Sequence, residues 1–296
     1  MKTNVTILTL VLGIACMQSA PAQSFKKVKV SGGAPIFQVA SGGASVWALA
    51  SNGHPYIFNG HSFVLANSIA LSQIAVGGGN AAQADAVWAL NSSGNIYRAS
   101  KSAGIWTFSQ VPGVLDLIQV GLGYQDSCHP YEVWGLNSGS LIFRYNYCTN
   151  TFDQQPGILC DIHVGGEDIW GAECGPKVYH FNFGSGNFDK ISDPFGAFPA
   201  LAVGPSGVWA IDTSSSVVYQ YDPFSTFQAV IGCCSQQIQA GGDGVWILAG
   251  TQILRYDPST LLFADVPGSL VSLSVGNGGG VWGINSSHQV FAFSTP

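Results

Sequence analysis

The chain has 296 residues, of which 47% are apolar, 12% aromatic and only 9% charged, with a net charge of −6. A nucleic-acid-binding protein needs a basic face to neutralise phosphates, so we expect no nucleic-acid partner. The aromatic content excludes a disordered chain, and the scarcity of Lys, Glu and Arg excludes long amphipathic helices.

The first 22 residues have the pattern of a secretory signal peptide. Lys2 is their only charged residue, an apolar run follows from Val5 to Ala15, and Ala20–Ala22 resembles a cleavage site. No later apolar stretch is long enough to span a membrane, so no transmembrane segment is expected. We therefore predict a signal peptide at 1–22 and a secreted protein, extracellular or periplasmic, formed by 23–296.

The cysteines agree with secretion. Cys16 lies in the predicted signal, where a lipoprotein would carry its acyl group, but Gly13 stands where such signals usually have Leu. The remaining number is even, as is typical of an oxidising compartment, and their spacing selects no pairing. No Cys or His cluster has zinc-ligand spacing, so we expect no metal and no other cofactor. The six remaining cysteines are Cys128, Cys148, Cys160, Cys174, Cys233 and Cys234.

Seven tryptophans recur at intervals of 36 to 46 residues, each directly after Val or Ile, and they mark seven copies of one unit. A short β-type run that ends in Gly precedes each tryptophan, as in Ile74–Gly77, with Ala40 expected in place of that Gly in the first copy. A turn, an alternating run such as Ile142–Asn146 and a fourth run that opens on Phe follow. The seven are Trp47, Trp88, Trp134, Trp170, Trp209, Trp246 and Trp282, and only Trp106 falls outside the series.

Four short strands in roughly 39 residues are typical of a propeller blade, and no window shows a sustained helical period. We therefore predict an all-β, seven-bladed β-propeller of four-stranded blades. The mature chain begins with a fourth-type strand and ends with a third-type strand. We expect Phe25–Val30 to pair with Val290–Phe293 in the last blade and to close the ring, because closure removes an open sheet edge.

The units resemble tectonin repeats. The resemblance is clearest in Val87–Arg98, Val133–Tyr145 and Phe263–Leu270, and it extends over nearly the whole mature chain. It implies a single propeller domain of seven tectonin-like repeats, similar to tachylectin-type and fish-egg lectins, which bind glycans or lipopolysaccharide on cell surfaces. Those lectins have six repeats, so the clefts of a seven-bladed ring can be placed differently.

The recurring tryptophans have two interpretations. They could stack on sugar rings, because aromatic faces attract polarised C–H surfaces. Alternatively they pack between blades, with the Ala or Gly that follows most of them making room for a ring of the neighbouring blade. We favour packing, because all seven occupy one strand position.

Four units carry Asn or Asp three residues after the tryptophan. Such a side chain at the end of a strand can bind sugar hydroxyls, and it can equally well accept hydrogen bonds from the backbone of a turn. Both interpretations remain open. These hypothetical ligand-binding residues are Asn91, Asn137, Asp212 and Asn285.

Three units carry Arg at the third position of the following strand. Arg makes forked hydrogen bonds to carboxylates, phosphates or pairs of hydroxyls, which suits an anionic or polyhydroxylated ligand. The alternative is a solvated outer face. The hypothetical ligand-binding arginines are Arg98, Arg144 and Arg255.

Two units have long insertions before the tryptophan, and the second insertion contains Cys128. Loops on a rigid scaffold are common functional places, but a tolerated loop stapled through Cys128 is the alternative.

No catalytic motif occurs, whether a GxSxG elbow, an HExxH helix, an EF-hand loop or a phosphate-binding glycine loop, so we expect no catalytic residues and no enzyme activity. The leading hypothesis is a secreted lectin that binds cell-surface glycans or lipopolysaccharide through several weak sites. A protein-binding propeller scaffold is the alternative, and a glycan-acting enzyme with carboxylates on separate blades is the third hypothesis. The sequence does not indicate an oligomeric state.

Overall fold

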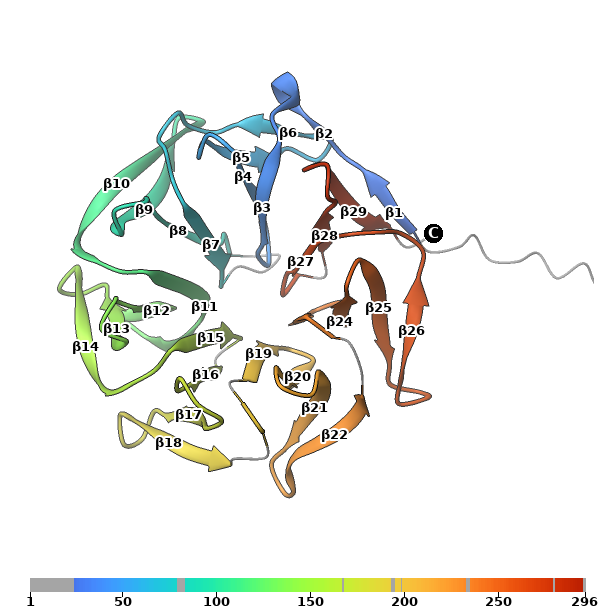
Figure 1. The fold of residues 1–296 in the computed structure, drawn as a ribbon. Helices are drawn as coiled ribbons and strands as arrows, with labels where there is room; N and C mark the ends of the chain where they lie inside the picture. Colours follow the sequence, from blue (N-terminus) through green and yellow to red (C-terminus); the bar gives the residue numbers. More distant parts are fainter. Residues whose placement is uncertain are drawn as a thin grey trace, which may run out of the picture.

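The computed structural model shows seven antiparallel sheets arranged as blades around a central axis (Figure 1). This confirms the predicted seven-bladed β-propeller. A single 3-10 turn, η1 (Ser31–Gly33), is the only helical element that the described residues contain, and none of them forms a helix with the length and apolar character needed to cross a membrane. The predicted signal peptide lies outside the described residues, which are 24–78, 83–166, 168–192, 195–197, 199–232, 235–278 and 280–294.

Each blade has four strands, counted outward from the axis, and blades 1 to 7 follow one another along the chain. The sheet of blade 1 has a fifth, outermost strand, β2 (Lys29–Val30). The first strands are β3 (Ile36–Ser41), β7 (Gln73–Gly77), β11 (Leu117–Asp126), β15 (Asp161–Gly165), β19 (Pro199–Gly204), β23 (Gln237–Gly241) and β27 (Ser272–Val275). The second strands are β4 (Val46–Ala50), β8 (Ala86–Leu90), β12 (His129–Leu136), β16 (Asp168–Ala172), β20 (Gly207–Asp212), β24 (Gly244–Ala249) and β28 (Val281–Ile284).

The outer half of each blade is a hairpin of the third and fourth strands. The third strands are β5 (Pro55–Phe58), β9 (Asn95–Ser102), β13 (Leu141–Asn146), β17 (Val178–Asn182), β21 (Val217–Asp222), β25 (Gln252–Asp257) and β29 (Val290–Ser294). The fourth strands are β6 (Ser62–Leu65), β10 (Ile105–Val114), β14 (Thr151–Ile158), β18 (Asn187–Ser192), β22 (Thr226–Gly232), β26 (Leu262–Val266) and, in blade 7, β1 (Ser24–Lys27).

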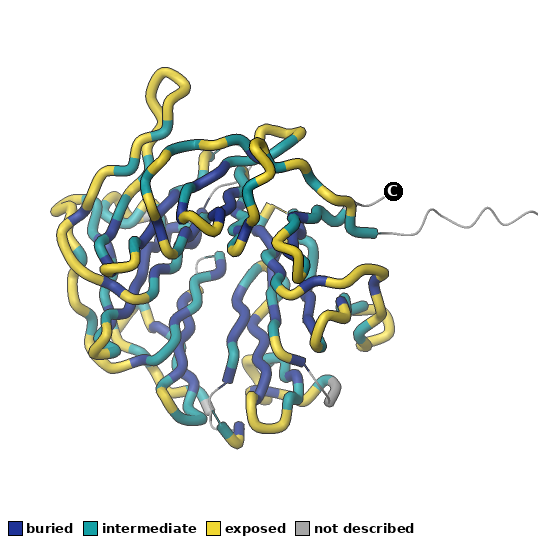
Figure 2. Tube along the Cα trace, turned by 45° about the horizontal axis from the view of Figure 1, so that its top comes forward, coloured by how far each residue is buried: buried dark blue, intermediate teal, exposed yellow. Residues whose placement is uncertain are grey.

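Burial decreases from the inner strands toward the outer hairpins (Figure 2). The second strands are continuous apolar runs, such as the sequence VWALA of β4, because neighbouring blades cover both of their faces. The fourth strands are mostly exposed, as in β14, where six of eight residues face water. The apolar core therefore lies between the blades rather than inside any one of them.

A glycine at the inner end of each blade allows neighbouring first strands to approach closely. At Gly77, a Cβ atom would collide with the carbonyl of Val120 in the next blade. In blade 1 this place belongs to Gly42, whose N–H continues the pairing of β3 with β4. The expectation of Ala40 here is wrong, because Ala40 pairs directly with Trp47 and Gly42 lies two residues further along.

The seven recurring tryptophans are all buried, and none is more than 6% exposed. Each one contacts aromatic rings of the next blade edge-on. The centroid of Trp134, for example, lies 4.7 Å from that of Phe181 and 5.8 Å from that of Phe188. In blade 7, Trp282 contacts Phe58 of blade 1 at 4.8 Å, so the series of contacts closes on itself. Packing between blades is confirmed for these residues.

Trp106 also has a structural explanation. In blade 2 the third strand lacks its inward aromatic ring, since Ala99 pairs with Phe108 as Tyr145 pairs with Phe152 in blade 3. The centroid of Trp106, on the fourth strand β10, lies 4.7 Å from that of Trp47 in blade 1. Trp106 therefore takes the place of the missing third-strand ring.

The N-terminal segment closes the ring in two steps. Strand β1 pairs antiparallel with β29, with Phe25 opposite Phe293, and the N–H of Val28 donates to the carbonyl of Val290. Lys29–Val30, strand β2, then leaves blade 7 and pairs in parallel with β6 of blade 1. The expected closure is thus confirmed for Phe25–Lys27 and wrong for Lys29–Val30, because the chain crosses there to the first blade.

We expect deletion of residues 23–31 to lower the melting temperature sharply, because it opens the edge of blade 7. A truncated chain can fail to fold for other reasons, so point variants provide the sharper test. Phe25 contacts Trp246 and Phe293, and Phe25→Ala should lower the free energy of unfolding by about 2 kcal/mol. The exposed Lys26 is the control, and equal denaturation midpoints for Phe25→Ala and Lys26→Ala would contradict the closure.

Trp106→Ala should cost about 2–3 kcal/mol of stability, because it leaves a cavity against Trp47. Ala99→Tyr, which restores the third-strand ring found in other blades, should recover part of that loss in the double variant. Urea denaturation of the two single variants and the double variant measures both effects, and additive losses would contradict the replacement.

Candidate functional site

Three clefts open between neighbouring blades at the level of the third and fourth strands. The blade 2/3 cleft, lined by Arg98 and Pro112 of blade 2 with Tyr145 of blade 3, has a volume of about 320 Å³. The blade 3/4 cleft, which contains Pro156, has a volume of about 270 Å³. The blade 5/6 cleft, which contains Arg255, is larger at about 790 Å³. Volumes in this range hold small ligands such as one or two sugar rings.

A proline–glycine pair borders each cleft, within the fourth strand in blades 2 and 3 and directly after it in blade 6. The proline stands four residues after the fourth-strand Phe, a pattern that only blades 2, 3 and 6 possess. Proline cannot donate to the strand ladder, and the glycine that follows adopts a positive φ, so the regular pairing is interrupted beside the cleft. Sequence reasoning missed this signal. The pairs are Pro112–Gly113, Pro156–Gly157 and Pro267–Gly268.

The predicted Asn residues lie in the turns between second and third strands. Oδ1 of Asn91 accepts hydrogen bonds from the N–H groups of Ser93 and Asn95, at 3.0 and 2.9 Å. Asn137 and Asn285 accept the same pair of bonds in their own blades. This geometry supports the turn interpretation. Each Asn belongs to a different blade and none lines the three clefts, so their role in ligand binding stays a prediction.

Asp212 accepts more hydrogen bonds than the asparagines do. It is 4% exposed, and its carboxylate accepts hydrogen bonds from Ser214, from the hydroxyl of Ser215 and from the N–H of Gly196. Burial raises the pKa of Asp212, but these hydrogen bonds to the charged form lower it by more, so its pKa lies below the usual value. Asp212 also lies outside the three clefts.

The three predicted arginines share a different geometry. Each pairs directly opposite the tryptophan of its own blade, and its guanidinium lies over the indole ring. The distances from Cζ to the ring centroid are 5.9 Å for Arg98, 5.5 Å for Arg144 and 5.3 Å for Arg255. Two of the three, Arg98 and Arg255, also line clefts.

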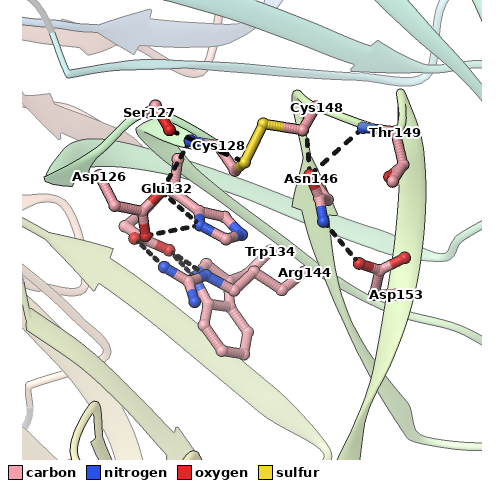
Figure 3. A network of polar contacts seen from close by, with 11 residues as sticks. Asp126, Ser127, Cys128, Glu132, Trp134, Arg144, Asn146, Cys148, Thr149 and Asp153 are labelled. Atoms are coloured by element: carbon pink, nitrogen blue, oxygen red, sulfur yellow. Dashed lines mark hydrogen bonds and ion pairs between the residues drawn. A yellow bond between two sulfur atoms is a disulfide. The ribbon is translucent and has the colours of Figure 1, made fainter.

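In blade 3 a buried carboxylate neutralises the arginine. Glu132 is 0% exposed and stands two residues before Trp134. Its Oε2 accepts hydrogen bonds from Nε of Arg144 at 2.8 Å and from Nε1 of Trp134 at 2.7 Å, and its Oε1 pairs with Nη2 of the same arginine (Figure 3). The two-pronged contact fixes the guanidinium over the indole.

Blades 4 and 6 repeat this arrangement. His180 stacks on Trp170 with centroids 4.6 Å apart, and its Nε2 lies 3.0 Å from a carboxylate oxygen of Asp168. In blade 6, Nη2 of Arg255 lies 3.4 Å from Oδ1 of Asp243. Burial raises the pKa of Asp243, and the positive charge of Arg255 opposes this rise. A basic group between an indole and an acid is therefore a recurring feature of the repeat.

Two disulfides lie in blades 3 and 4. Cys128–Cys148 ties the long β11–β12 hairpin to the β13–β14 turn (Figure 3), and Cys160–Cys174 joins two loops of blade 4. The first bond confirms a loop stapled through Cys128. Cys233 and Cys234 lie outside the described residues.

The central channel forms another cavity, of about 280 Å³, lined by the first strands. The carboxamide of Gln38 donates to the carbonyl of Ile74 in the next blade and accepts from the N–H of the same residue. Gln73 and Gln237 make the same double bond to the next first strand, so these amides join blades to each other. The side chains described along the channel are amides, hydroxyls, aliphatic groups and the imidazole of His163.

The family model for the Tectonin domain matches residues 18–187 and 159–295 of this chain. No protein with a curated description matches it significantly. Solved structures show the same fold at low sequence identity, so this similarity supports the fold assignment and nothing further. The structure of YCF48 bound to D1 peptide is 11% identical, covers 94% of this chain and 100% of its own, and has a TM-score of 0.66. The Neurospora crassa Pan2 WD40 domain is 12% identical, with coverage of 89% and 90% and a TM-score of 0.62.

We expect Asp212→Asn to destabilise the protein by about 1–2 kcal/mol at neutral pH, because it removes a charged acceptor of several hydrogen bonds. The pKa of Asp212 is lowered in the folded protein, so its contribution exists above the unfolded-state pKa and is lost as pH falls through the folded-state value. The stability gap between wild type and variant should therefore shrink below about pH 4. Denaturation at several pH values measures it. Asp116→Asn, at an exposed bend between β10 and β11, is the control, and a gap that does not change with pH would contradict this assignment.

Proposed function

This chain belongs to the Tectonin domain family, and from that premise we propose that it is a secreted, non-enzymatic lectin that binds glycans in the clefts between its blades. The observation that carries the proposal is the set of three outer clefts, each of a size that suits a sugar and each beside a proline–glycine pair. The tryptophans contribute to these sites only by holding the blades together, since they are buried.

The blade 5/6 cleft has the chemistry that a neutral sugar requires. Arg255 supplies N–H donors, while Asp243, Asp257 and Asp265 supply acceptors, and Tyr256 adds a ring and a hydroxyl. Sugars present alternating hydroxyl and C–H surfaces, which hydrogen-bonding groups beside an aromatic ring can bind. With acids outnumbering the single arginine, this cleft favours an uncharged polyhydroxylated ligand.

Several weak sites on one ring suit a surface ligand. Glycans and lipopolysaccharide are displayed at high density on cells, and simultaneous occupation of separate clefts raises the apparent affinity by about 10²–10⁴-fold. Two disulfides and the signal-like N-terminus favour an oxidising compartment outside the cytoplasm.

A protein-binding scaffold is the second candidate function. Phe224 is 98% exposed and Leu261 is 63% exposed, and each lies in the turn between a third and a fourth strand. Exposed apolar groups of this size are common at protein interfaces. One propeller of similar fold is described bound to a peptide. Capture of a protein partner that added sugars do not displace would favour this candidate.

The lectin proposal predicts that the protein binds glycans on an array. A neutral glycan selected from the array should then show saturable binding in calorimetry. Arg255→Gln should weaken that binding by about tenfold or more at the blade 5/6 cleft, because it removes a charged donor. Lys27→Gln, on the exposed outer strand of blade 7, is the matched control and should bind as wild type. Failure to bind any glycan at millimolar concentration would contradict the proposal.

A further inference from the structure

The position opposite the tryptophan carries a basic side chain in four blades, and in three of them a carboxylate of the same blade contacts it. These three blades show the complete arrangement, a basic side chain paired with an acid, with which blade 2 can be compared. The complete pairs are Arg144 with Glu132, His180 with Asp168, and Arg255 with Asp243.

In blade 2 no acid among the described residues pairs with the basic group. Asp85 stands three residues before Trp88, as Asp243 does before Trp246, but its carboxylate accepts hydrogen bonds from backbone N–H groups at 43–45 of blade 1. Ala86 stands two residues before Trp88 and pairs with Gly77, the register that Glu132 has in blade 3. The guanidinium of Arg98 makes neither an ion pair nor a hydrogen bond with any residue in the part of the chain that the structure describes. Nε1 of Trp88 is buried without a hydrogen-bond partner there, as is Nε1 of Trp170 in blade 4, whereas Nε1 of Trp134 donates to Glu132.

The unpaired guanidinium is held in place by aromatic rings. Its Cζ lies 5.9 Å from the ring centroid of Trp88 and 4.8 Å from that of Tyr147 in blade 3. The backbone N–H of Tyr147 donates to the carbonyl of Cys128, whose disulfide to the neighbouring Cys148 staples the loop. Arg98 is therefore preorganised, yet its side chain remains exposed and accessible to a ligand.

Tyr147 does not supply the missing negative charge. Burial raises its pKa well above the usual value, an effect that the nearby Trp88 and Arg98 oppose only in part, so the phenol is neutral at physiological pH. Its hydroxyl lies toward the indole of Trp88 but makes no hydrogen bond within normal geometry. Both buried polar groups thus remain without a full partner beside the cation.

No acid occurs among the described residues that line the blade 2/3 cleft beside Arg98. The polar groups that line it are the hydroxyls of Ser100, Ser109 and Tyr145 and the amides of Gln110 and Asn150. Of the described side chains that line it, only Arg98 is charged, whereas three carboxylates line the blade 5/6 cleft. The two clefts therefore differ in charge although they are built on the same repeat.

We propose that the blade 2/3 cleft binds the anionic substituent of a glycan, and that this oxyanion provides for Arg98 the counter-charge that Glu132 provides for Arg144. The inference rests on the proposed glycan binding and assigns its charge class and its blade. A carboxylate of a sugar acid and a phosphate ester both present two oxygens to the guanidinium fork. The sugar ring then lies against the hydroxyl and amide groups of the cleft.

The test compares three monosaccharides by calorimetry or ligand-observed NMR at low ionic strength: methyl glucuronide, glucose 6-phosphate and methyl glucoside. Arg98→Gln should weaken binding of at least one acidic sugar by about tenfold or more and leave the neutral sugar unchanged. The acidic sugar whose affinity falls in Arg98→Gln identifies the carboxylate or the phosphate as the group that Arg98 binds. Raising the salt concentration should also weaken the binding of that acidic sugar.

Ala86→Glu offers an independent test, because it places in blade 2 the acid that blade 3 already has. It should abolish acidic-sugar binding although Arg98 is still present. Ala86→Gln adds the same volume without charge and should retain that binding, and thermal melts of both variants establish that they fold.

Equal affinity for acidic and neutral sugars, or unchanged acidic-sugar binding in Arg98→Gln, would overturn this inference while leaving the lectin proposal intact. Absence of binding to any glycan, neutral or acidic, would overturn both. Loss of acidic-sugar binding in Ala86→Gln as well as in Ala86→Glu would overturn the charge argument, since the added bulk alone would then explain it.

Discussion

The ring depends on one repeated contact, in which the tryptophan of each blade is buried against aromatic rings of the next. A four-stranded sheet of this size cannot bury both faces alone, so each blade is stable only between two neighbours. The contacts form a closed circle, because Trp282 of blade 7 packs against Phe58 and Phe63 of blade 1. The N-terminal strands complete that circle by pairing with blade 7 first and blade 1 afterwards.

This constraint explains why so much of the fold could be predicted from the sequence. A ring that buries one large side chain per unit leaves a regular tryptophan spacing, and that spacing gives the number of blades. Register was harder to predict. Ala40 follows Val39 as Gly77 follows Val76, yet only strand pairing shows that Gly42 holds the glycine place. The crossing of Lys29–Val30 to blade 1 is a parallel contact between distant segments, for which no local pattern exists.

The candidate site was predictable only in its residue types. Arg98, Arg144 and Arg255 stand at one repeat position, but their partners do not, since the acid lies two residues before the tryptophan in blade 3 and three before it in blade 6. Whether an arginine is neutralised therefore depends on cross-strand geometry. The asparagines show the opposite case, because their hydrogen bonds to N–H groups two and four residues away are local and follow from turn chemistry.

The same scaffold can thus carry sites of different charge without any change in the packing that holds it together. Each tryptophan packs its indole against the next blade and so holds the propeller together. Where a basic residue stands opposite the tryptophan, it needs only a counter-charge, and the fold does not require that charge to come from a particular residue. Where the chain supplies that charge, as Glu132 does, the guanidinium is locked and 13% exposed. Where it does not, as at Arg98, the guanidinium is exposed beside a cleft with no acid among its described lining residues. The aromatic platform that orients the arginine belongs to the fold itself, so it carries a neutralised guanidinium in blade 3 and, in blade 2, one without an acidic partner among the described residues.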